Sequence, residues 1–174
     1  MAKAARRIPM TVTFLEMNVR PTALPPPQPR GKIALLKCEN PPPHFYRYLY
    51  DTIGADYNWV DRKKLSPEKL AEIIHDPRNQ LFVLYTDGNP AGMAELDLRK
   101  EGQVNISYFG LMPEAIGKRL GFFFAYHVCM NAWALPIQRL TINTCTLDHP
   151  RALPLYQRLG FTAYAREERF VELP

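Results

Sequence analysis

Residues 116–121 (IGKRLG) have the types and the spacing that could bind an anionic group. They follow a β-rich segment and open a long apolar one, so we expect a strand that turns into a helix N-terminus. The first N–H groups of a helix lack internal acceptors, and its dipole places about half a positive charge there. Gly117 and Gly121 carry no side chain that would hold an anion off, and Lys118 and Arg119 add cationic donors. The segment therefore predicts a site for a pyrophosphate.

The segments on either side of this loop predict a strand before it and a buried helix after it. Residues 104–111 are rich in β-branched and aromatic side chains, which is typical of a strand. Residues 117–134 are apolar on nearly every side, which predicts a well-buried helix that Pro136 ends. The anion site would therefore lie where a strand passes into a helix.

Periodic patterns and turn residues along the rest of the chain predict an alternation of strands and helices. Strands are expected at 10–17, 32–37, 80–86, 91–99 and 139–144, and residues 161–165 and 169–173 are expected to form a last hairpin. Helices are expected at 44–54, 67–76 and 148–158. The sequence DGNP at 87–90 suits the turn of a hairpin, and Gly160 suits the end of a helix.

The prolines are concentrated near the N-terminus, where nine of the seventeen lie within the first 43 residues. This composition makes the region stiff, extended and poor in ladder hydrogen bonds. We therefore expect a proline-rich N-terminal extension over residues 1–31, which can hold an extra strand, followed by one domain over residues 32–174. A chain of 174 residues is long enough for one real core and too short for two comfortable ones.

The composition excludes several classes of protein. The 47% hydrophobic and 22% charged residues are ordinary for a folded globular protein, and no run of about 18 apolar residues could cross a membrane. Cys38, Cys129 and Cys145 are widely spaced without a C-x-x-C pair, and the histidines have no ligand spacing. Neither a disulfide framework nor a metal site is therefore expected.

The net charge of +5 and the pI of about 9.2 favour anionic partners in general, such as a phosphorylated cofactor, a nucleic acid or an acidic surface. A basic N-terminal arm carries Lys3, Arg6 and Arg7, but the chain lacks the basic stripe with interleaved aromatic residues of nucleic-acid-binding proteins. Nucleic-acid binding is therefore disfavoured. The segment after the arm is short, carries Glu16 and lacks a cleavage site, so a cytoplasmic protein is expected.

Two strings of the sequence together carry a family resemblance. Residues 116–121 (IGKRLG) are similar to a Gln/Arg-x-x-Gly-x-Gly/Ala loop for the pyrophosphate of coenzyme A, and residues 152–161 (ALPLYQRLGF) to a closing A-x-x-L-Y-x-x-x-G-F element. With these strings and the order of its elements, the chain from 32 to 171 resembles the GNAT superfamily of acyl-CoA N-acyltransferases. The resemblance implies an α/β (α+β) fold in which helices flank a central, mixed, mostly antiparallel and splayed β-sheet.

Three residues depart from the family pattern. Ile116 stands where the family usually has Gln or Arg, Arg119 stands where the middle glycine is expected, and His149 replaces an asparagine seven residues before the tyrosine. Arg119 brings a side chain to a point where backbone normally approaches phosphate, so we expect it to point outward or to pair with a phosphate. The backbone donors remain, so the resemblance still implies coenzyme binding.

The resemblance implies acetyl-CoA as the co-substrate, with no metal, and suggests where it binds. Main-chain groups of Leu111 and Met112 would pair with the pantetheine like an added strand. The residues that would hold the pyrophosphate are Gly117, Lys118, Arg119, Leu120 and Gly121. His149 is assigned to the cofactor site by its position, with the capping of a helix as the alternative.

Forming an amide from a thioester requires a neutral amine, a polarised carbonyl and a protonated leaving thiolate. An alkylamine with a pKa of about 10.4 is largely protonated at pH 7, so a base or a desolvating pocket helps. The resemblance makes Glu95, on the strand beside the cofactor strand, the first candidate for this base, directly or through a water. Asp97 shares its face of a regular strand and is the second candidate. The alternative is that both are solvated strand carboxylates.

Tyr156 is the candidate acid, because a phenol with a pKa of about 10 stays protonated at neutral pH and matches the tyrosine of the family's closing element. Its alternative is a core aromatic residue. The loop between the first two helices, where the family shapes its acceptor pocket, contains Tyr57, Trp59, Asp61 and Arg62. Tyr57 and Trp59 are assigned to substrate binding, and so is Asp97. The alternative is an exposed loop pinned by Trp59. His127, on the apolar helix, is expected to be a core residue.

The leading hypothesis is an enzyme of the class EC 2.3.1.-, an N-acetyltransferase. It would transfer an acetyl group from acetyl-CoA to a primary amine of a small molecule or peptide by direct attack in a ternary complex. The alternative is a non-catalytic protein that binds or senses acyl-CoA through a degenerate site. The amine, the length of the acyl chain and the oligomeric state are left open, and a homodimer is compatible with the sequence.

Overall fold

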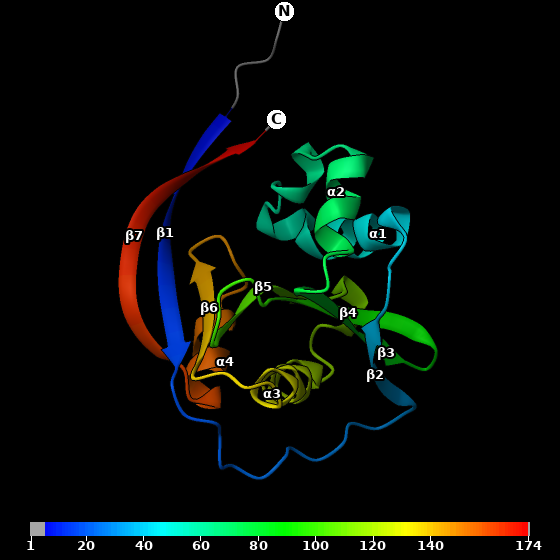
Figure 1. Cartoon of the computed structure of the whole chain (residues 1–174), viewed down its shortest axis with the longest axis vertical. Coiled ribbons are helices and arrows are strands. Elements are labelled where there is room, and N and C mark those ends of the chain that lie inside the picture. Colours follow the sequence, from blue (N-terminus) through cyan, green and yellow to red (C-terminus); the bar gives the residue numbers. More distant parts are fainter. Residues whose placement is uncertain (1–5, 174) are drawn as a thin grey trace, which may run out of the picture.

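The computed structural model describes residues 6–173, so the part of the predicted basic arm that contains Lys3 lies outside the described residues. Strands and helices alternate along the described chain (Figure 1). The strands are β1 (Arg6–Met17), β2 (Ile33–Cys38), β3 (Asn79–Thr86), β4 (Asn89–Asp97), β5 (Gln103–Leu111), β6 (Arg139–Cys145) and β7 (Thr162–Leu173). The α-helices are α1 (Pro43–Gly54), α2 (Pro67–Ile74), α3 (Leu120–Trp133) and α4 (Ala152–Leu159), and short 3-10 helices are η1 (Ala55–Tyr57), η2 (Arg62–Lys64) and η3 (Pro113–Ala115).

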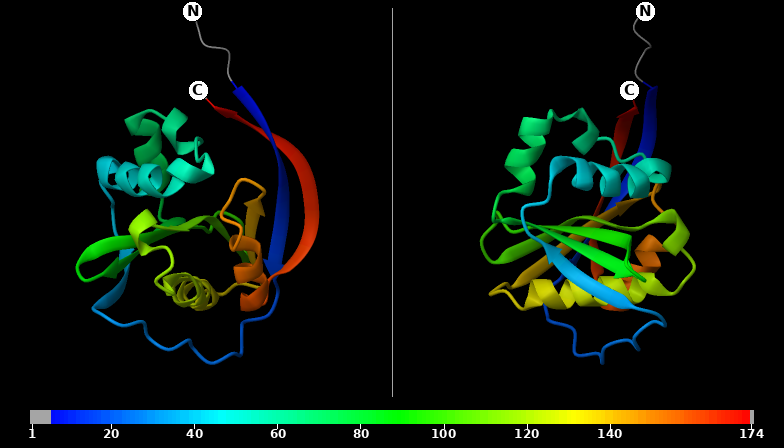
Figure 2. Two further views of the ribbon diagram at one scale, coloured as in Figure 1. Left: turned by 180° about the vertical axis from the view of Figure 1, so that it is seen from behind. Right: turned by 90° about the vertical axis from the view of Figure 1, so that its right-hand side faces the viewer.

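The strands form a seven-stranded sheet in the order β2-β3-β4-β5-β6-β1-β7. Neighbouring strands are antiparallel, except that β5 and β6 are parallel. The helices α1 and α2 cover one face of the sheet, and α3 and α4 lie on the other (Figures 1 and 2). The predicted mixed, mostly antiparallel sheet flanked by helices is therefore confirmed.

The sheet opens between β5 and β6, because these strands pair only over Gln103–Ile106 and Arg139–Ile142. A β-bulge accompanies the opening. It leaves Ser107 of β5 without a partner on β4, since the pairing register shifts between Glu95 and Leu96. An extra residue in one strand bends that strand and increases its twist. Beyond the bulge, β5 and β6 diverge, and the predicted splay is present.

The N-terminal strand lies inside the sheet rather than at its edge. β1 pairs with β6 through Val12–Met17 and with β7 through Arg6–Glu16. The extra strand expected in the N-terminal extension therefore forms, and it joins the same sheet as the rest of the chain. The division of the chain at residue 31 stays a prediction. Because β6 pairs with only the second half of β1, the first half of β1 and the end of β7 form a two-stranded arm (Figure 1).

The predicted C-terminal hairpin is wrong, because β7 is one strand of 12 residues from Thr162 to Leu173. In the sequence, the charged run 166–169 looks like an interruption between two short strands, but it contains no glycine, proline or asparagine that would favour a turn. Most side chains of β7 are exposed, from its first residue to Glu172 near its end. Its charged side chains therefore reach water without leaving the strand.

The segment between β1 and β2 runs beneath α3 in the view of Figure 1. We call its residues 21–31 the proline strap. The hydroxyl of Tyr126 in α3 donates a hydrogen bond to the carbonyl of Ala23 (3.0 Å). After the strap, the N–H of Lys32 donates to Oδ1 of Asp87 (3.0 Å), and the N–H of Asp87 donates to the carbonyl of Lys32 (2.8 Å). The strap is therefore held at both ends.

The helix α3 begins at Leu120, three residues later than the sequence predicts. The backbone of Gly117 (φ 82°) and of Arg119 (φ 60°) is left-handed, which a right-handed helix cannot contain. The helix itself is buried as predicted: Phe124 and Val128 are fully enclosed. None of the helices in the described chain has the length and the apolar run that a membrane crossing needs.

Candidate active site

A cleft of about 1870 Å³ opens where β5 and β6 separate. Its walls include Ile106–Leu111 of β5, Ile142 and Asn143 of β6, the segment 116–123, and Tyr156 of α4. A pocket for one small ligand typically measures about 300–1,000 Å³. The cleft is therefore large enough for two reactants to meet beside the opening of the sheet.

The loop before α3, residues 113–119, borders this cleft through Ile116–Arg119. Its left-handed residues, Gly117 and Arg119, turn the chain into the first turn of α3. No side chain caps the N-terminus of α3, and the N–H groups of a first helical turn have no acceptor within the helix. Free donors at the positive end of a helix suit a phosphate.

Gly121 leaves space in front of these donors. A Cβ atom added at Gly121 would lie 3.8 Å from Leu111 and 4.0 Å from Leu155, so the packing of the protein alone does not require glycine there. A Cβ atom added at Gly117 would meet nothing within 4 Å. Lys118 is an exposed residue of the same loop. Free donors, open space and a cation together fit the pyrophosphate that the sequence predicts.

The main chain of β5 offers Phe109 and Leu111 to the cleft, and not Met112. The N–H of Met112 donates to the carbonyl of Ala91 (2.9 Å), and its carbonyl accepts from the N–H of Ala115 (2.9 Å). Its side chain is fully buried. Residues that bond across an antiparallel pair alternate with residues that face away. Phe109 and Leu111 therefore direct their main-chain groups toward the opening, and the predicted pairing with pantetheine would move from Met112 to Phe109.

Tyr156 lies on the cleft wall with only 6% of its surface exposed. Its ring packs edge-on against Phe109 and Phe161, with both centroids 6.2 Å away. Burial raises the pKa of its hydroxyl above the ordinary value near 10, and the charge of Asp148 raises it further. The hydroxyl is therefore protonated at neutral pH, as a proton donor must be. This position is compatible with both interpretations of Tyr156 from the sequence, the candidate acid and the core aromatic residue.

Asp148 is a cleft residue that sequence reasoning treated only as the start of a helix. Its Oδ2 accepts hydrogen bonds from the hydroxyl of Thr144 (2.7 Å) and from the N–H of Cys145 (2.8 Å). Its negative charge acts on the hydroxyls of Tyr156 and Tyr57, which burial already makes harder to ionise. The sequence predicted that a helix starts at Asp148, whereas α4 begins only at Ala152, and the link to Tyr156 comes only from the fold.

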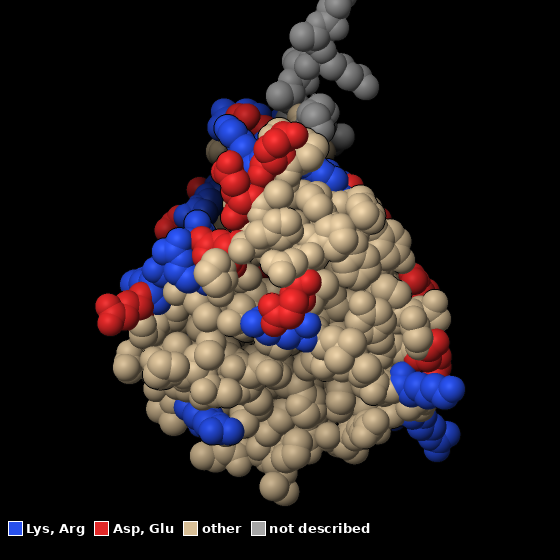
Figure 3. All heavy atoms as spheres, turned by 45° about the vertical axis from the view of Figure 1, so that its right-hand side comes forward, with Lys and Arg blue, Asp and Glu red and all other residues tan. Residues whose placement is uncertain are grey.

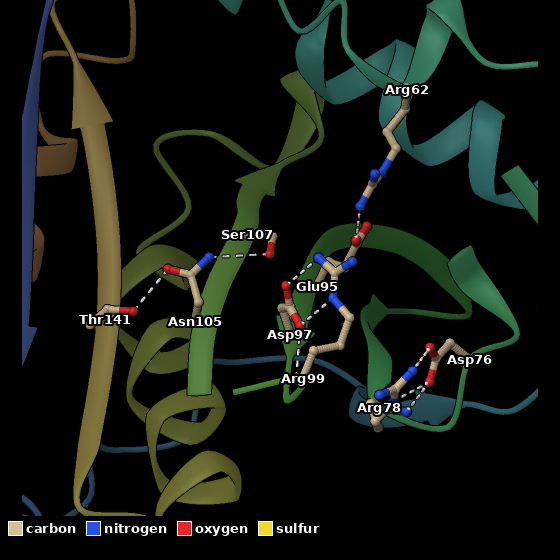
Figure 4. A network of polar contacts seen from close by, with 9 residues as sticks. All are labelled: Arg62, Asp76, Arg78, Glu95, Asp97, Arg99, Asn105, Ser107 and Thr141. Atoms are coloured by element: carbon tan, nitrogen blue, oxygen red, sulfur yellow. Dashed lines mark hydrogen bonds and ion pairs between the residues drawn. The ribbon is translucent and has the colours of Figure 1, made fainter. Parts of the chain in front are cut away.

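Glu95 lies in a buried cluster under α1 that consists of Tyr46, Arg62 and Glu95. The carboxylate has no exposed surface and accepts a hydrogen bond from the hydroxyl of Tyr46. It also forms an ion pair with Arg62 (Figure 4). Nε of Arg62 also donates to the hydroxyl of Tyr46 (3.2 Å). Arg62 lines the cleft, whereas Glu95 does not. The structure therefore does not bring the predicted base into the cleft, because Arg62 stands in between.

Asp97 lies at the rim of the cleft and is paired with Arg99 (Figure 4). Nε and Nη2 of Arg99 donate to its two oxygens at 2.9 and 2.6 Å. These hydrogen bonds lower the pKa of the Asp97 carboxyl below its ordinary range. The group is ionised at neutral pH but is a weak proton acceptor.

Tyr57 and Trp59 both line the cleft, as the sequence predicts. The ring of Trp59 lies 5.2 Å from the ring of Tyr50 and 5.0 Å from that of Tyr108. A Cβ atom at Gly54 would come within 2.4 Å of Trp59, so glycine is needed there for the close approach. The loop is thus pinned by Trp59 and also borders the cleft, and its contact with a substrate stays a prediction.

His149 lines the cleft as well, near the N-terminus of α4. Its Nδ1 accepts a hydrogen bond from the N–H of Arg151 (3.2 Å), and its ring contacts that of Tyr57 edge-on, 6.4 Å between centroids. Both expectations for His149, a place at the cofactor site and the capping of a turn before α4, are compatible with this position.

The structure brings together most of the predicted site residues and adds a wall that sequence reasoning missed. Those that line the cleft are Tyr57, Trp59, Asp97, Leu111, Gly117, Lys118, Arg119, Leu120, Gly121, His149 and Tyr156. Glu95 and Met112 do not line it. The missed wall consists of Pro26–Arg30 in the proline strap, together with Met10 and Val12 of β1. Within residues 6–173, no three His, Cys, Asp or Glu side chains converge as metal ligands do.

Comparison with known proteins connects this geometry to a family. A family model described as the acetyltransferase (GNAT) family matches residues 46–161. No curated protein sequence is detectably similar to the chain.

Several solved structures share the fold. A GCN5-related N-acetyltransferase from Kribbella flavida is 17% identical with a TM-score of 0.63, covering 95% of this chain and 60% of that one. One from Sphaerobacter thermophilus is 14% identical with a TM-score of 0.66, covering 97% and 53%. The spermidine N-acetyltransferase from Vibrio cholerae, in complex with CoA and spermine, is 16% identical with a TM-score of 0.62, covering 80% and 95%. This chain thus spans about three fifths or less of the first two proteins.

Proposed function

The chain belongs to the acetyltransferase (GNAT) family, and we propose that it transfers an acetyl group from acetyl-CoA to a primary amine of a small molecule or peptide. One observation carries the proposal. The uncapped start of α3 faces the same cleft as Tyr156, at the point where β5 and β6 separate. An anion-binding turn, a proton donor and an opening for a second reactant therefore share one space.

Binding of acetyl-CoA would rest on the main chain. The free N–H groups at the start of α3 would hold the pyrophosphate, with Lys118 and Arg119 beside them. The outward-facing groups of Phe109 and Leu111 would extend β5 by hydrogen bonds to the pantetheine. When bound, acetyl-CoA supplies a thioester carbonyl that an amine can attack.

Tyr156 would act as the acid. The departing sulfur needs a proton donor that is still protonated at neutral pH and is shielded from water. Burial keeps the Tyr156 hydroxyl protonated, and its ring is fixed by Phe109 and Phe161. We assign it to the proton that the leaving thiolate takes up.

Neither of the two carboxylates that the sequence predicts as a base is available to deprotonate the amine. The Glu95 carboxylate is engaged with Tyr46 and Arg62, and the Asp97 carboxyl has a lowered pKa. We propose that the amine loses its proton to water at the rim where Asp97 lies, and that Glu95 is a positioning residue for Arg62. The rate at subsaturating amine should then rise about tenfold per pH unit toward the pKa of the amine. A plateau near pH 7 would instead favour Glu95 or Asp97 as the base.

The test combines calorimetry with a chemical assay. Acetyl-CoA and CoA are titrated into the protein, and release of free thiol is then followed over a panel of polyamines, small alkylamines, amino acids and short peptides. We expect binding of acetyl-CoA and thiol release with at least one amine class. If neither acetyl-CoA nor CoA gives a heat of binding, the proposal is rejected.

A second candidate is a non-catalytic protein that binds acyl-CoA. The enclosure of Glu95 behind Arg62 favours it, because the carboxylate that the sequence predicts first as the base does not line the cleft. Tight binding of acetyl-CoA without thiol release across the whole panel would support this candidate against the enzyme.

A further inference from the structure

The proline strap forms one wall of the cleft, although it lies far in sequence from the rest of the site. Pro26–Arg30 line the same space as residues 116–123. The strap runs from the end of β1 to the start of β2 beneath α3 (Figure 2). It therefore borders the cleft on the side of α3 that faces away from the sheet.

The strap is stiff and is anchored without any sheet pairing. Each proline holds its φ near −65°, and consecutive prolines favour an extended chain. The hydrogen bond from Tyr126 to Ala23 fixes its beginning, and the two hydrogen bonds between Lys32 and Asp87 fix its end. A preorganised segment loses little conformational entropy when a ligand binds against it. The strap is thus suited to be a binding wall.

Arg30 places a positive charge on this wall. It is exposed, it lines the cleft, and none of the ion pairs among residues 6–173 involves it. The carboxylate of Asp87, which also borders the cleft, already accepts the N–H of Lys32. Lys118 and Arg119 lie on the same cleft. On the face shown in Figure 3, Lys and Arg side chains gather at the upper left together with Asp and Glu, and only isolated charged groups lie on the remainder of that face.

We propose that the proline strap holds the adenosine end of the coenzyme and that Arg30 binds its 3′-phosphate. This inference rests on the proposed function. Coenzyme A carries two phosphates in its pyrophosphate and a third on the ribose, further from the thioester. In the proposed function the N–H groups at the start of α3 bind the pyrophosphate, which leaves the third phosphate for an exposed donor elsewhere on the cleft wall, as Arg30 is. The planar fork of an arginine suits that phosphate.

The test measures how strongly the protein distinguishes CoA from 3′-dephospho-CoA. Both ligands are titrated calorimetrically into the unaltered full chain, Arg30→Ala and Arg20→Ala. Arg20 is a matched control, because it is an exposed arginine one residue before the strap and does not line the cleft. We expect the unaltered protein and Arg20→Ala to bind CoA about tenfold more tightly than 3′-dephospho-CoA, the size of one charge-assisted hydrogen bond. Arg30→Ala should bind CoA about tenfold less tightly and 3′-dephospho-CoA unchanged.

Each contrary result is distinct. If Arg30→Ala keeps the preference for CoA, or weakens both ligands equally as a purely structural role would, the proposal is overturned. Equal affinity of the unaltered protein for both ligands also overturns it and leaves the proposed function standing. Failure of both ligands to bind the unaltered protein overturns the proposed function as well.

Discussion

The loop before α3 and the buried cluster under α1 both hold charged or polar groups beside the same cleft. The loop relies on main-chain groups, whereas the cluster relies on side chains. The loop offers main-chain N–H groups, which almost any side chain leaves in place. Arg119 stands where the family motif has glycine, and its backbone is nevertheless left-handed. The cluster depends on the side chains of Tyr46, Arg62 and Glu95. Backbone conformation therefore matters more in the loop, and residue identity matters more in the cluster.

The largest effect is expected from Glu95→Gln, which leaves the half-buried Arg62 without its counter-charge. Removing one partner of a buried ion pair typically costs about 3–5 kcal/mol of the free energy of unfolding. Urea unfolding at pH 7 measures this loss. The control is Asp97→Asn, which breaks the ion pair with the largely exposed Arg99 and should cost about 1 kcal/mol or less. Equal losses in the two variants would show that the cluster depends on its ion pair no more than the exposed pair at the end of β4 does.

A second variant tests whether charge or shape causes that loss. In Glu95→Gln combined with Arg62→Gln, no buried charge is left without a partner, so part of the stability should return. If the double variant is as unstable as the sum of the two single ones, the ion pair is not the reason.

The next effect concerns the main chain of the loop before α3. Gly121→Pro removes one N–H that has no acceptor within the helix, while proline is tolerated in a first helical turn. Gly121→Ala keeps the N–H and adds a Cβ that the protein can accommodate. We expect the proline variant to bind acetyl-CoA about 10- to 100-fold more weakly than the alanine variant, the equivalent of about 1.5–3 kcal/mol. Similar affinities by calorimetry would show that this N–H does not contact the cofactor.

The next smaller effect is expected from Tyr156→Phe, which removes one hydroxyl and keeps the ring contacts with Phe109 and Phe161. Turnover should fall at least about tenfold, or about 1.4 kcal/mol in the barrier, with little change in stability. Because burial raises the pKa of this hydroxyl, the acid is present at all pH values below its ordinary pKa. No loss of rate from its ionisation is therefore expected up to about pH 10. Full activity of the variant would reject the assignment.

The smallest effect is expected from Arg119→Gly. The left-handed backbone of Arg119 costs a residue with a Cβ about 1–2 kcal/mol, and glycine relieves this strain. Glycine also gives the unfolded chain more conformational freedom, which cancels part of the gain in stability. A net stabilisation of up to about 1 kcal/mol should appear as a higher midpoint in urea. Lys118→Gly serves as the control, since Lys118 is not among the residues with positive φ, and should destabilise slightly. A shift of both variants in the same direction would argue against strain at Arg119.

Much of the fold was predictable because its patterns are local. The turn sequence DGNP between two strand segments predicted the β3–β4 hairpin, and an all-round apolar segment predicted the buried helix α3. The failure at β7 has a local cause as well. The charges at 166–169 interrupt an apolar pattern, and the sequence does not reveal that β7 is largely exposed on an outer edge of the sheet.

Within the site, the sequence by itself determined the glycine turn before α3, the apolar helix that follows, and a tyrosine on a short helix. These features depend on backbone preferences and periodicity among neighbouring residues. The tertiary structure decided the environment of Glu95, since its partners Tyr46 and Arg62 lie 49 and 33 residues away. It also decided that the proline strap borders the cleft. Contacts between distant segments depend on how strands and helices pack, and that packing is not encoded in any short stretch of sequence.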